Sequence, residues 1–397
     1  MPVYSADLIY TLVHPEPLSN YGIETDASGK IISIGPLEQY QASWGEVYHS
    51  EGIIVPGFVN AHCHLELSHM KGLIPAGTGL IEFIKNVVTR RGERPMEDIL
   101  IEISKSEDEM IQTGIVAVGD ISNQVDTFLQ KSLGRIRYHT FVEAFDLLQN
   151  DRTEIEINKS QAILDQLSGP EGHKKSLVPH APYSVSRTMF KLLNDKNNRN
   201  TSVSIHHQET LDENQFMFNK TGGLMEFYNS LNLNLNDFNP IGAMSSRQVI
   251  DLMDAGRRTL LVHNTMSTPQ DINAIHAWNP NTFWVTCPNA NLYIENRLPF
   301  YKYFMDQDAA VCIGTDSLAS NWQLSILEEM KTIQRYQSYV PWNRLLQWAT
   351  LNGALALGFE KDLGSLEVGK TPGLVNIFPF DSVGQKLGPY SRATRLI

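Results

Sequence analysis

The 397-residue sequence has few cysteines, no long apolar run and no cluster of basic residues. Its three cysteines, Cys63, Cys287 and Cys312, are far apart, which argues for reduced thiols and predicts a cytoplasmic location. No stretch approaches ~18 consecutive apolar residues and no signal-peptide pattern opens the chain, so neither a membrane span nor export is expected. The formal net charge of −12 predicts no binding to nucleic acid or to an anionic membrane.

Four common catalytic or cofactor motifs are missing as well. The first apolar run is not followed by Gly-x-Gly-x-x-Gly, which disfavours a dinucleotide-binding fold. Without Gly-x-Ser-x-Gly, a serine hydrolase is not expected. The stretch "HLELSH" does not have the order of His-Glu-x-x-His, and "TCPNAN" lacks the second cysteine of the Pro-Cys-x-x-Cys deaminases.

Short apolar runs instead alternate with helical patterns between about residue 53 and residue 320. Such alternation predicts βαβ units and a parallel sheet, and eight runs is the strand count of a (β/α)₈ TIM-type barrel. A doubly wound open sheet is the structural alternative. The runs are "GIIVPGFVNAH", "GIVAVGDIS", "RIRYHTFVEAF", "KSLVPHAPYSV", "TSVSIHHQET", "TLLVHNT", "NTFWVTCPNA" and "AVCIGTDSLAS".

Both ends of the chain fall outside this rhythm. Residues 1–54 and the tail, including "GSLEVGKTPGLVNIFPF", are predicted to form strands joined by turns. The sequence therefore predicts a small composite β domain from residues 1–54 and 360–397, beside a barrel of residues 55–359. Residues 211–245 form an unusually long connection, which is typical of a lid or a binding loop.

Residues with metal-binding and proton-transfer chemistry lie at the predicted carboxyl ends of the strands, which form the active-site face of such a barrel. His62 and His64 are two residues apart and share one side of a strand, whereas Cys63 faces away. Three histidines and an aspartate would suit Zn²⁺, Fe²⁺ or Mn²⁺ and leave a position for water. The residues at strand ends are His62, His64, His180, His206, His207, Glu209, His263 and Asp316.

Six stretches together resemble the amidohydrolase superfamily, and within it the mononuclear deaminase and chlorohydrolase branch. They are "PGFVNAHCHLE", "HHQET", "LVHNT", "CPNANLYI", "GTDSLASN" and "TLNGALALGFEKDLGSLEVGKTPGLVNI". The resemblance covers about residues 50–377 and implies one divalent ion, with zinc expected first and iron or manganese as alternatives. The ligands that it implies are His62, His64, His206 and Asp316.

The resemblance also implies roles for the neighbouring side chains. Glu209 would carry protons, His263 would act as an electrophile or position the water, and Asp316 would take the proton of that water. No predicted strand ends in a lysine that could be carbamylated, which favours a single metal. His180 would contact the substrate, although it could equally cap its strand, and Glu66 is expected in a loop at the mouth.

The reaction expected from this resemblance is hydrolytic deamination of an aromatic N-heterocycle. The substrates expected first are purine-nucleoside-like compounds such as aminofutalosine, S-adenosylhomocysteine or methylthioadenosine. Arg90 and Arg91 end the helix after strand 1 and would favour a substrate carboxylate, or would simply be a solvated helix end. A chlorohydrolase or amide hydrolase, and more remotely a non-catalytic metal-binding barrel, are the alternatives; a homodimer stays open.

Overall fold

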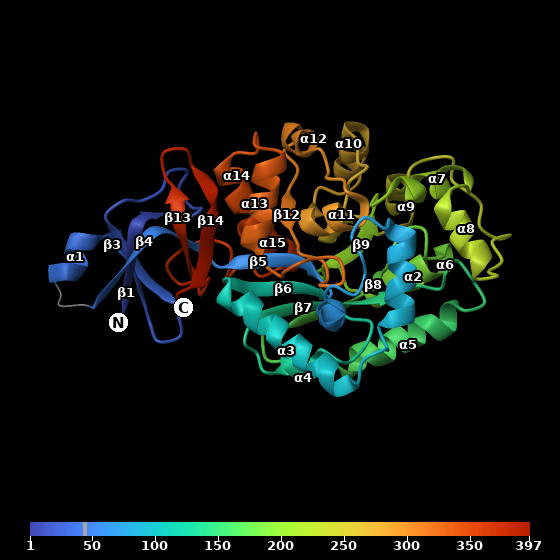
Figure 1. The fold of residues 1–397 in the computed structure, drawn as a ribbon, viewed down its shortest axis with the longest axis horizontal. Helices are drawn as coiled ribbons and strands as arrows, with labels where there is room; N and C mark the ends of the chain where they lie inside the picture. The colour runs from blue at the N-terminus through green and yellow to red at the C-terminus, as the bar shows by residue number, and fades with distance from the viewer. Residues whose placement is uncertain (43–45) are drawn as a thin grey trace.

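The computed structural model describes residues 1–42 and 46–397, and both ends of the chain meet in one six-stranded sheet (Figure 1). The strand order is β14-β13-β4-β1-β2-β3, and β13 pairs antiparallel with β4 from the other end of the chain. Its elements are β1 (Val3–Ile9), β2 (Tyr21–Thr25), β3 (Ile31–Pro36), α1 (Leu37–Ala42), β4 (Val47–Pro56), β13 (Leu374–Asp381) and β14 (Lys386–Arg395).

The central part of the chain forms two four-stranded parallel sheets, ordered β5-β6-β7-β8 and β12-β11-β10-β9. These strands are buried along most of their length, as expected for parallel strands covered by helices. Each of the eight predicted runs contributes one of them, so the predicted α/β class is confirmed. The strands are β5 (Phe58–Cys63), β6 (Ile115–Ile121), β7 (Arg137–Ala144), β8 (Lys174–Pro179), β9 (Val203–His207), β10 (Thr259–His263), β11 (Thr282–Thr286) and β12 (Val311–Ile313).

Hydrogen bonds join the two sheets at two seams. At one seam the backbone N–H groups of Thr315 and Asp316 both donate to the carbonyl of His62. At the other, the backbone N–H of His206 donates to the carbonyl of His180. Both seams therefore lie at the carboxyl ends of strands, beside the predicted site residues.

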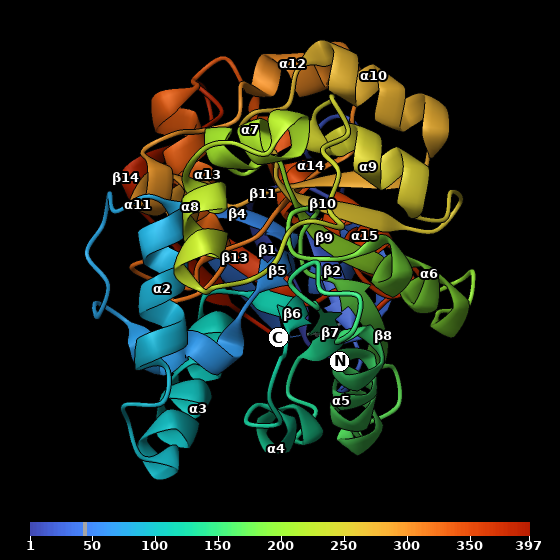
Figure 2. The ribbon, with the colours of Figure 1, turned by 90° about the vertical axis from the view of Figure 1, so that its right-hand side faces the viewer.

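Helices surround these strands on the outside (Figure 2). In α3 (Met96–Gln112), the helix directly before β6, Ile99, Ile103 and Met110 are buried. This is the pattern of a helix that packs one face on a sheet. The surrounding helices are α3 (Met96–Gln112), α4 (Phe128–Ser132), α5 (Thr153–Gln166), α6 (Arg187–Lys196), α9 (Ser245–Leu252), α10 (Pro269–Trp278), α11 (Pro288–Glu295), α12 (Tyr301–Asp306), α13 (Ile326–Tyr336), α14 (Trp342–Ala349) and α15 (Leu351–Leu357). Within the described part of the chain, no helix is long and apolar enough to span a bilayer.

The long connection between β9 and β10 folds as α7 (Leu211–Asn219), α8 (Gly223–Ser230) and a following loop. Its buried Phe216 stacks on Tyr228 and Phe238, with ring centroids 5.4 and 5.0 Å apart. This apolar cluster also contains Leu80, the first residue of α2 (Leu80–Arg90), and is separate from the main core. We call residues 211–245 the cap segment; α2, α7 and α8 lie at the end of the molecule away from the six-stranded sheet (Figure 1).

Two local expectations differ from the structure. Residues 364–368 of the tail form a loop rather than a strand. Within this loop, the backbone N–H of Leu366 donates to the Thr11 carbonyl. The second strand of the tail is β14, which lies beyond the predicted run. Glu66, expected in a loop, lies in a short 3₁₀ helix, η1 (Leu65–Met70), and is buried.

Candidate metal centre

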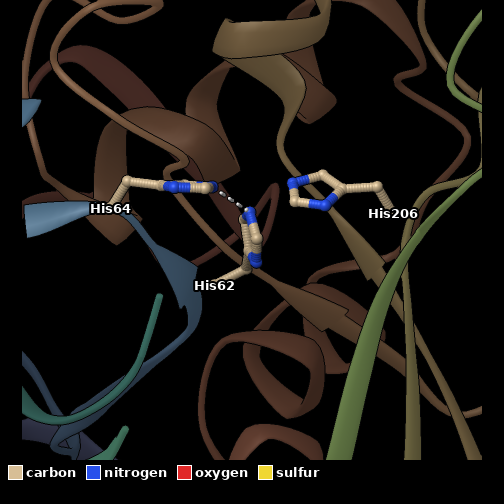
Figure 3. A group of neighbouring side chains, drawn as sticks. All are labelled: His62, His64 and His206. Atoms are coloured by element: carbon tan, nitrogen blue, oxygen red, sulfur yellow. Dashed lines mark hydrogen bonds between the residues drawn. The ribbon is translucent and has the colours of Figure 1, made fainter. Parts of the chain in front are cut away.

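Three histidine side chains converge where β5 and β9 end (Figure 3). The Nε2 atoms of His62 and His64 are 3.1 Å apart, and the ligand atoms of His62, His64 and His206 all lie within 4.8 Å of one another. Asp316 comes from the loop after β12, and its Oδ1 is 3.7 Å from His62 Nε2 and 3.4 Å from His64 Nε2. The structure thus brings together the four residues that the sequence predicted as ligands.

The spacing and chemistry of these groups fit a divalent cation. Ligand atoms about 2.1 Å from a tetrahedral zinc ion lie about 3.4 Å apart, close to the distances among His62, His64 and Asp316. Burial lowers the pKa of His62, and lowers that of His64 to about 4, so both rings are neutral and can offer lone pairs. Burial alone would raise the pKa of Asp316, but the contacts of its carboxylate with the surrounding imidazoles of His62, His64 and His263 hold it well below its usual range.

The backbone around Asp316 holds its carboxylate against the histidines. Gly314 leaves room for His62, because a Cβ at this glycine would lie 2.8–2.9 Å from His62 atoms. Ser320 Oγ donates to Asp316 Oδ2 over 2.7 Å, which directs Oδ1 toward the imidazoles. Asp316 itself has φ of 56°, and His263 has φ of 79°, left-handed values that non-glycine residues adopt at an energetic cost.

Glu209 and His263 form a second layer of reactive groups beside the cluster. His263 Nε2 lies 3.6 Å from Glu209 Oε1, and the Asn291 amide donates to His263 Nδ1. Burial raises the pKa of Glu209 to about 8; His206 opposes this shift, whereas Asp316 adds to it. A carboxyl group that titrates near neutral pH can both accept and release a proton during a reaction.

The residues predicted to contact substrate fall into two groups. His180 lies beside the cluster, with its ring centroid 4.9 Å from that of His206 and its Nδ1 2.7 Å from Ser184 Oγ. Arg91 bonds Glu66 over 3.3 Å, and Arg90 bonds Glu93 and the Leu73 carbonyl. The contacts of both guanidinium groups are therefore with neighbouring protein groups rather than with the histidine cluster.

Glu143 was not singled out from the sequence. Glu143 lies at the carboxyl end of β7, and its Oε1 is 3.3 Å from His206 Nδ1. Glu143, His180 and His206 also present ligand atoms within 4.8 Å of one another. The signal that identified the other residues, a polar side chain at a strand's carboxyl end, was present in "HTFVEAF" and could have identified Glu143 too.

Comparison with known proteins gives the same picture over most of the chain. The chain is 25% identical over 380 residues to adenosine deaminase of Helicobacter pylori, covering 92% of this chain and 88% of that protein. Its fold is similar to the crystal structure of Helicobacter pylori aminofutalosine deaminase in complex with methylthio-coformycin. That match has a TM-score of 0.80 and 24% identity, and covers 96% of this chain and 93% of the other.

A third similar protein is the atrazine chlorohydrolase of Arthrobacter aurescens TC1, whose crystal structure is a complex with zinc. The TM-score is 0.74 at 18% identity, and the match covers 99% of this chain and 93% of the other. The profile of the Amidohydrolase family matches residues 53–386, which include every residue of the histidine cluster, Asp316, Glu209 and His263. The chain belongs to the amidohydrolase family.

Proposed function

We propose that the protein is a metal-dependent aminohydrolase that removes an amino group from an aromatic N-heterocycle, most readily a purine-nucleoside-like compound. The observation that carries this proposal is the placement of Glu209 and His263 beside three histidines and Asp316. The similarity to adenosine and aminofutalosine deaminases supports the same reaction class.

The proposed cofactor is a single divalent ion, with zinc preferred over iron or manganese. His62, His64, His206 and Asp316 would hold it, and the donor distances described above support this set. When bound, such an ion lowers the pKa of a coordinated water and polarises the group under attack. Zinc in the similar chlorohydrolase structure agrees with this preference.

The side chains would then divide the proton transfers of hydrolysis among themselves. Asp316, whose pKa is low, accepts a proton from the attacking water through its carboxylate. Glu209 delivers its proton to the ring nitrogen next to the attacked carbon, and the proton held by Asp316 passes to the leaving amino group. The second proton of the water returns to Glu209 as the new carbonyl forms. His263 places Nε2 beside Glu209, where it can position the water or stabilise developing negative charge. One water is consumed and one ammonia is released.

The buried carboxyl of Glu209 favours ammonia over chloride as the leaving group. An amino group must gain a proton before it departs, whereas chloride departs as an anion without one. A carboxyl with a pKa of about 8 retains its proton at neutral pH and can give it to the ring nitrogen, which leaves the proton taken up by Asp316 for the amino group. For this reason, we rank deamination above the chlorohydrolase alternative.

The scaffold of this site is proposed to be one closed (β/α)₈ barrel of residues 55–359. The hydrogen bonds at both seams support closure of the two four-stranded sheets. Residues 1–54 and 360–397 would form the composite β domain, whose strands meet in the six-stranded sheet. A cytoplasmic location and a homodimer stay predictions.

The substrate contacts of His180, Arg90 and Arg91 also stay predictions. His180 has the best position for contact, because its ring borders that of His206. Arg91 could bind a substrate carboxylate only by sharing or leaving Glu66. A benzoate-bearing compound such as aminofutalosine is therefore proposed on the overall similarity to the aminofutalosine deaminase, rather than on a free arginine.

A deamination screen tests the proposed reaction. Zinc- and iron-loaded protein is incubated with aminofutalosine, S-adenosylhomocysteine, methylthioadenosine, adenosine, guanine and cytosine, while ultraviolet absorbance and ammonia are followed. We expect ammonia release from at least one purine nucleoside. Chloride release from a chlorinated triazine without ammonia from any of the six compounds would instead support the chlorohydrolase alternative.

A further inference from the structure

Glu143 is a buried carboxylate in direct contact with a proposed metal ligand, and no step of the proposed reaction uses it. Its side chain is about 2% exposed and lies at the carboxyl end of β7. Oε1 faces His206 Nδ1 at 3.3 Å, and Oε2 accepts a hydrogen bond of 2.8 Å from Asn123 Nδ2. Both carboxylate oxygens therefore face hydrogen-bond donors.

The surroundings of His206 define which ring nitrogen carries the proton. Nδ1 lies 2.9 Å from the His180 carbonyl and 3.3 Å from Glu143 Oε1. A carbonyl and a carboxylate can only accept, so Nδ1 must be the donor. In the neutral ring, which metal binding requires, the lone pair is then on Nε2, and the ring points toward His62 and His64 (Figure 3).

The Asn123 side chain binds both the carboxylate and the backbone N–H of Glu143. Its Nδ2 donates to the Glu143 carboxylate, and its Oδ1 accepts the Glu143 backbone N–H over 3.2 Å. The backbone N–H groups of Asn123 and Gln124 in turn donate to Glu66 Oε2, 2.8 and 2.9 Å away. Arg91 binds the other oxygen of Glu66, so a chain of polar contacts runs from Arg91 to His206.

We propose that Glu143 is a positioning residue that fixes the tautomer and orientation of His206 for metal binding, and that Glu66 and Asn123 hold it in place. This inference rests on the metal site of the proposed function. A carboxylate on the far nitrogen of a metal-binding imidazole raises the basicity of the ring, and its loss typically weakens metal affinity 10–100-fold. Glu143 thus acts through His206, without touching the substrate.

Glutamine in place of Glu143 tests this role, because an amide can accept from only one of the two donors. We expect Glu143→Gln to raise the zinc Kd about 10–100-fold in a competition with a chromophoric chelator. The visible absorption of the cobalt-loaded variant should also shift, because the basicity and orientation of one ligand change. Asn123→Ala should weaken zinc binding in the same direction by a smaller factor.

Glu107→Gln is the matched control. Glu107 is a buried carboxylate that accepts from Tyr138 and Gln130 and has no described contact with the histidine cluster. Its variant should keep the wild-type zinc affinity and cobalt spectrum, whatever its cost in thermal stability. If Glu143→Gln does not fold, unchanged zinc affinity in Asn123→Ala alone overturns the proposal.

Metal stoichiometry separates the remaining readings. One ion per chain in both wild type and Glu143→Gln, bound more weakly in the variant, supports the positioning role. Two ions per wild-type chain and one in the variant would make Glu143 a ligand and overturn it. Wild-type protein that binds no divalent ion would overturn the proposed function itself, whereas tight binding unaffected by Glu143→Gln would overturn only the inference.

Discussion

At the scale of single residues, the site depends on carboxyl groups whose surroundings push their pKa values apart. Burial raises the pKa of Glu209, whereas the imidazoles around Asp316 outweigh burial and hold its pKa low. Two carboxyl groups in one site can therefore take opposite roles, one holding a proton and the other accepting it. Both assignments can be tested without changing the size of the side chain.

Glu209→Gln keeps the shape of the side chain but removes its ability to transfer protons. We expect kcat to fall about 10²–10⁴-fold, the usual contribution of a general acid–base group. The zinc content, measured by atomic absorption, should stay at the wild-type level because Glu209 is not one of the four proposed ligands. A variant with full turnover would remove Glu209 from the mechanism.

His139 provides a residue-scale prediction away from the site. It is 1% exposed on β7, and burial lowers its pKa to about 3. The folded state keeps the ring neutral, whereas the unfolded chain takes up a proton below pH 6.5. His139 therefore costs no stability above pH 6.5, and its cost grows as the pH falls toward 3.

The cost from His139 should reach about 2 kcal/mol at pH 5. Urea unfolding of wild type and His139→Gln at pH 7 and pH 5 measures it. The variant, whatever its stability at pH 7, should lose about 2 kcal/mol less than wild type between these two pH values. Equal losses in the two proteins would show that His139 titrates normally in the folded state.

At the scale of elements, the cap segment packs in an apolar cluster that is distinct from the core under the strands and that it shares with Leu80, Tyr183 and other residues outside the segment. Phe216 on α7 is fully buried between Tyr228 and Phe238. A unit with a small separate core can open without unfolding the rest of the molecule. The cap segment is therefore expected to be the first large element to loosen.

Phe216→Ala should expose this behaviour. Removing a buried phenylalanine ring costs about 3–5 kcal/mol, and the loss should fall mainly on the cap segment. Limited proteolysis with mass spectrometry should show cleavage first within residues 211–245. Phe218→Ala on the same helix is the control, because Phe218 is 48% exposed and should leave the cleavage pattern unchanged. First cuts elsewhere in Phe216→Ala would contradict a separate cap.

At the scale of the whole molecule, the six-stranded sheet joins residues that are more than 300 positions apart in the chain. β13 lies between β14 and β4, and Val375 and Ile377 are buried with the main core. The two ends of the chain consequently stabilise each other through paired strands and shared apolar contacts.

A chain that ends at Gly373 should lose this mutual support. It lacks β13 and β14, so β4 becomes an exposed sheet edge that can pair with other copies. We expect a lower Tm than that of the full chain, and aggregation on size-exclusion chromatography. Monomeric, fully stable protein without residues 374–397 would show that the sheet does not need them.

The sequence indicated local patterns well and long-range contacts poorly. Periodicity located the eight parallel strands. The positions of His62, His64 and Asp316 at strand ends indicated that these side chains lie close together, as they do in the structure. β14 was missed because only two of its ten positions are buried and its pairing with β13 decides its structure. The engagement of Arg91 by Glu66 depends on how η1 meets the end of α2, which no local pattern describes.

The position of the two hydrogen-bonded seams gives the proposed metal a structural role in addition to its chemical one. His62 and His64 belong to the half of the chain that contains β5, whereas His206 and Asp316 belong to the half that contains β9 and β12. An ion held by all four would link the two four-stranded sheets to each other. Its removal would first loosen the packing of the two sheets against each other. Correct docking of the sheets and metal binding would therefore depend on each other.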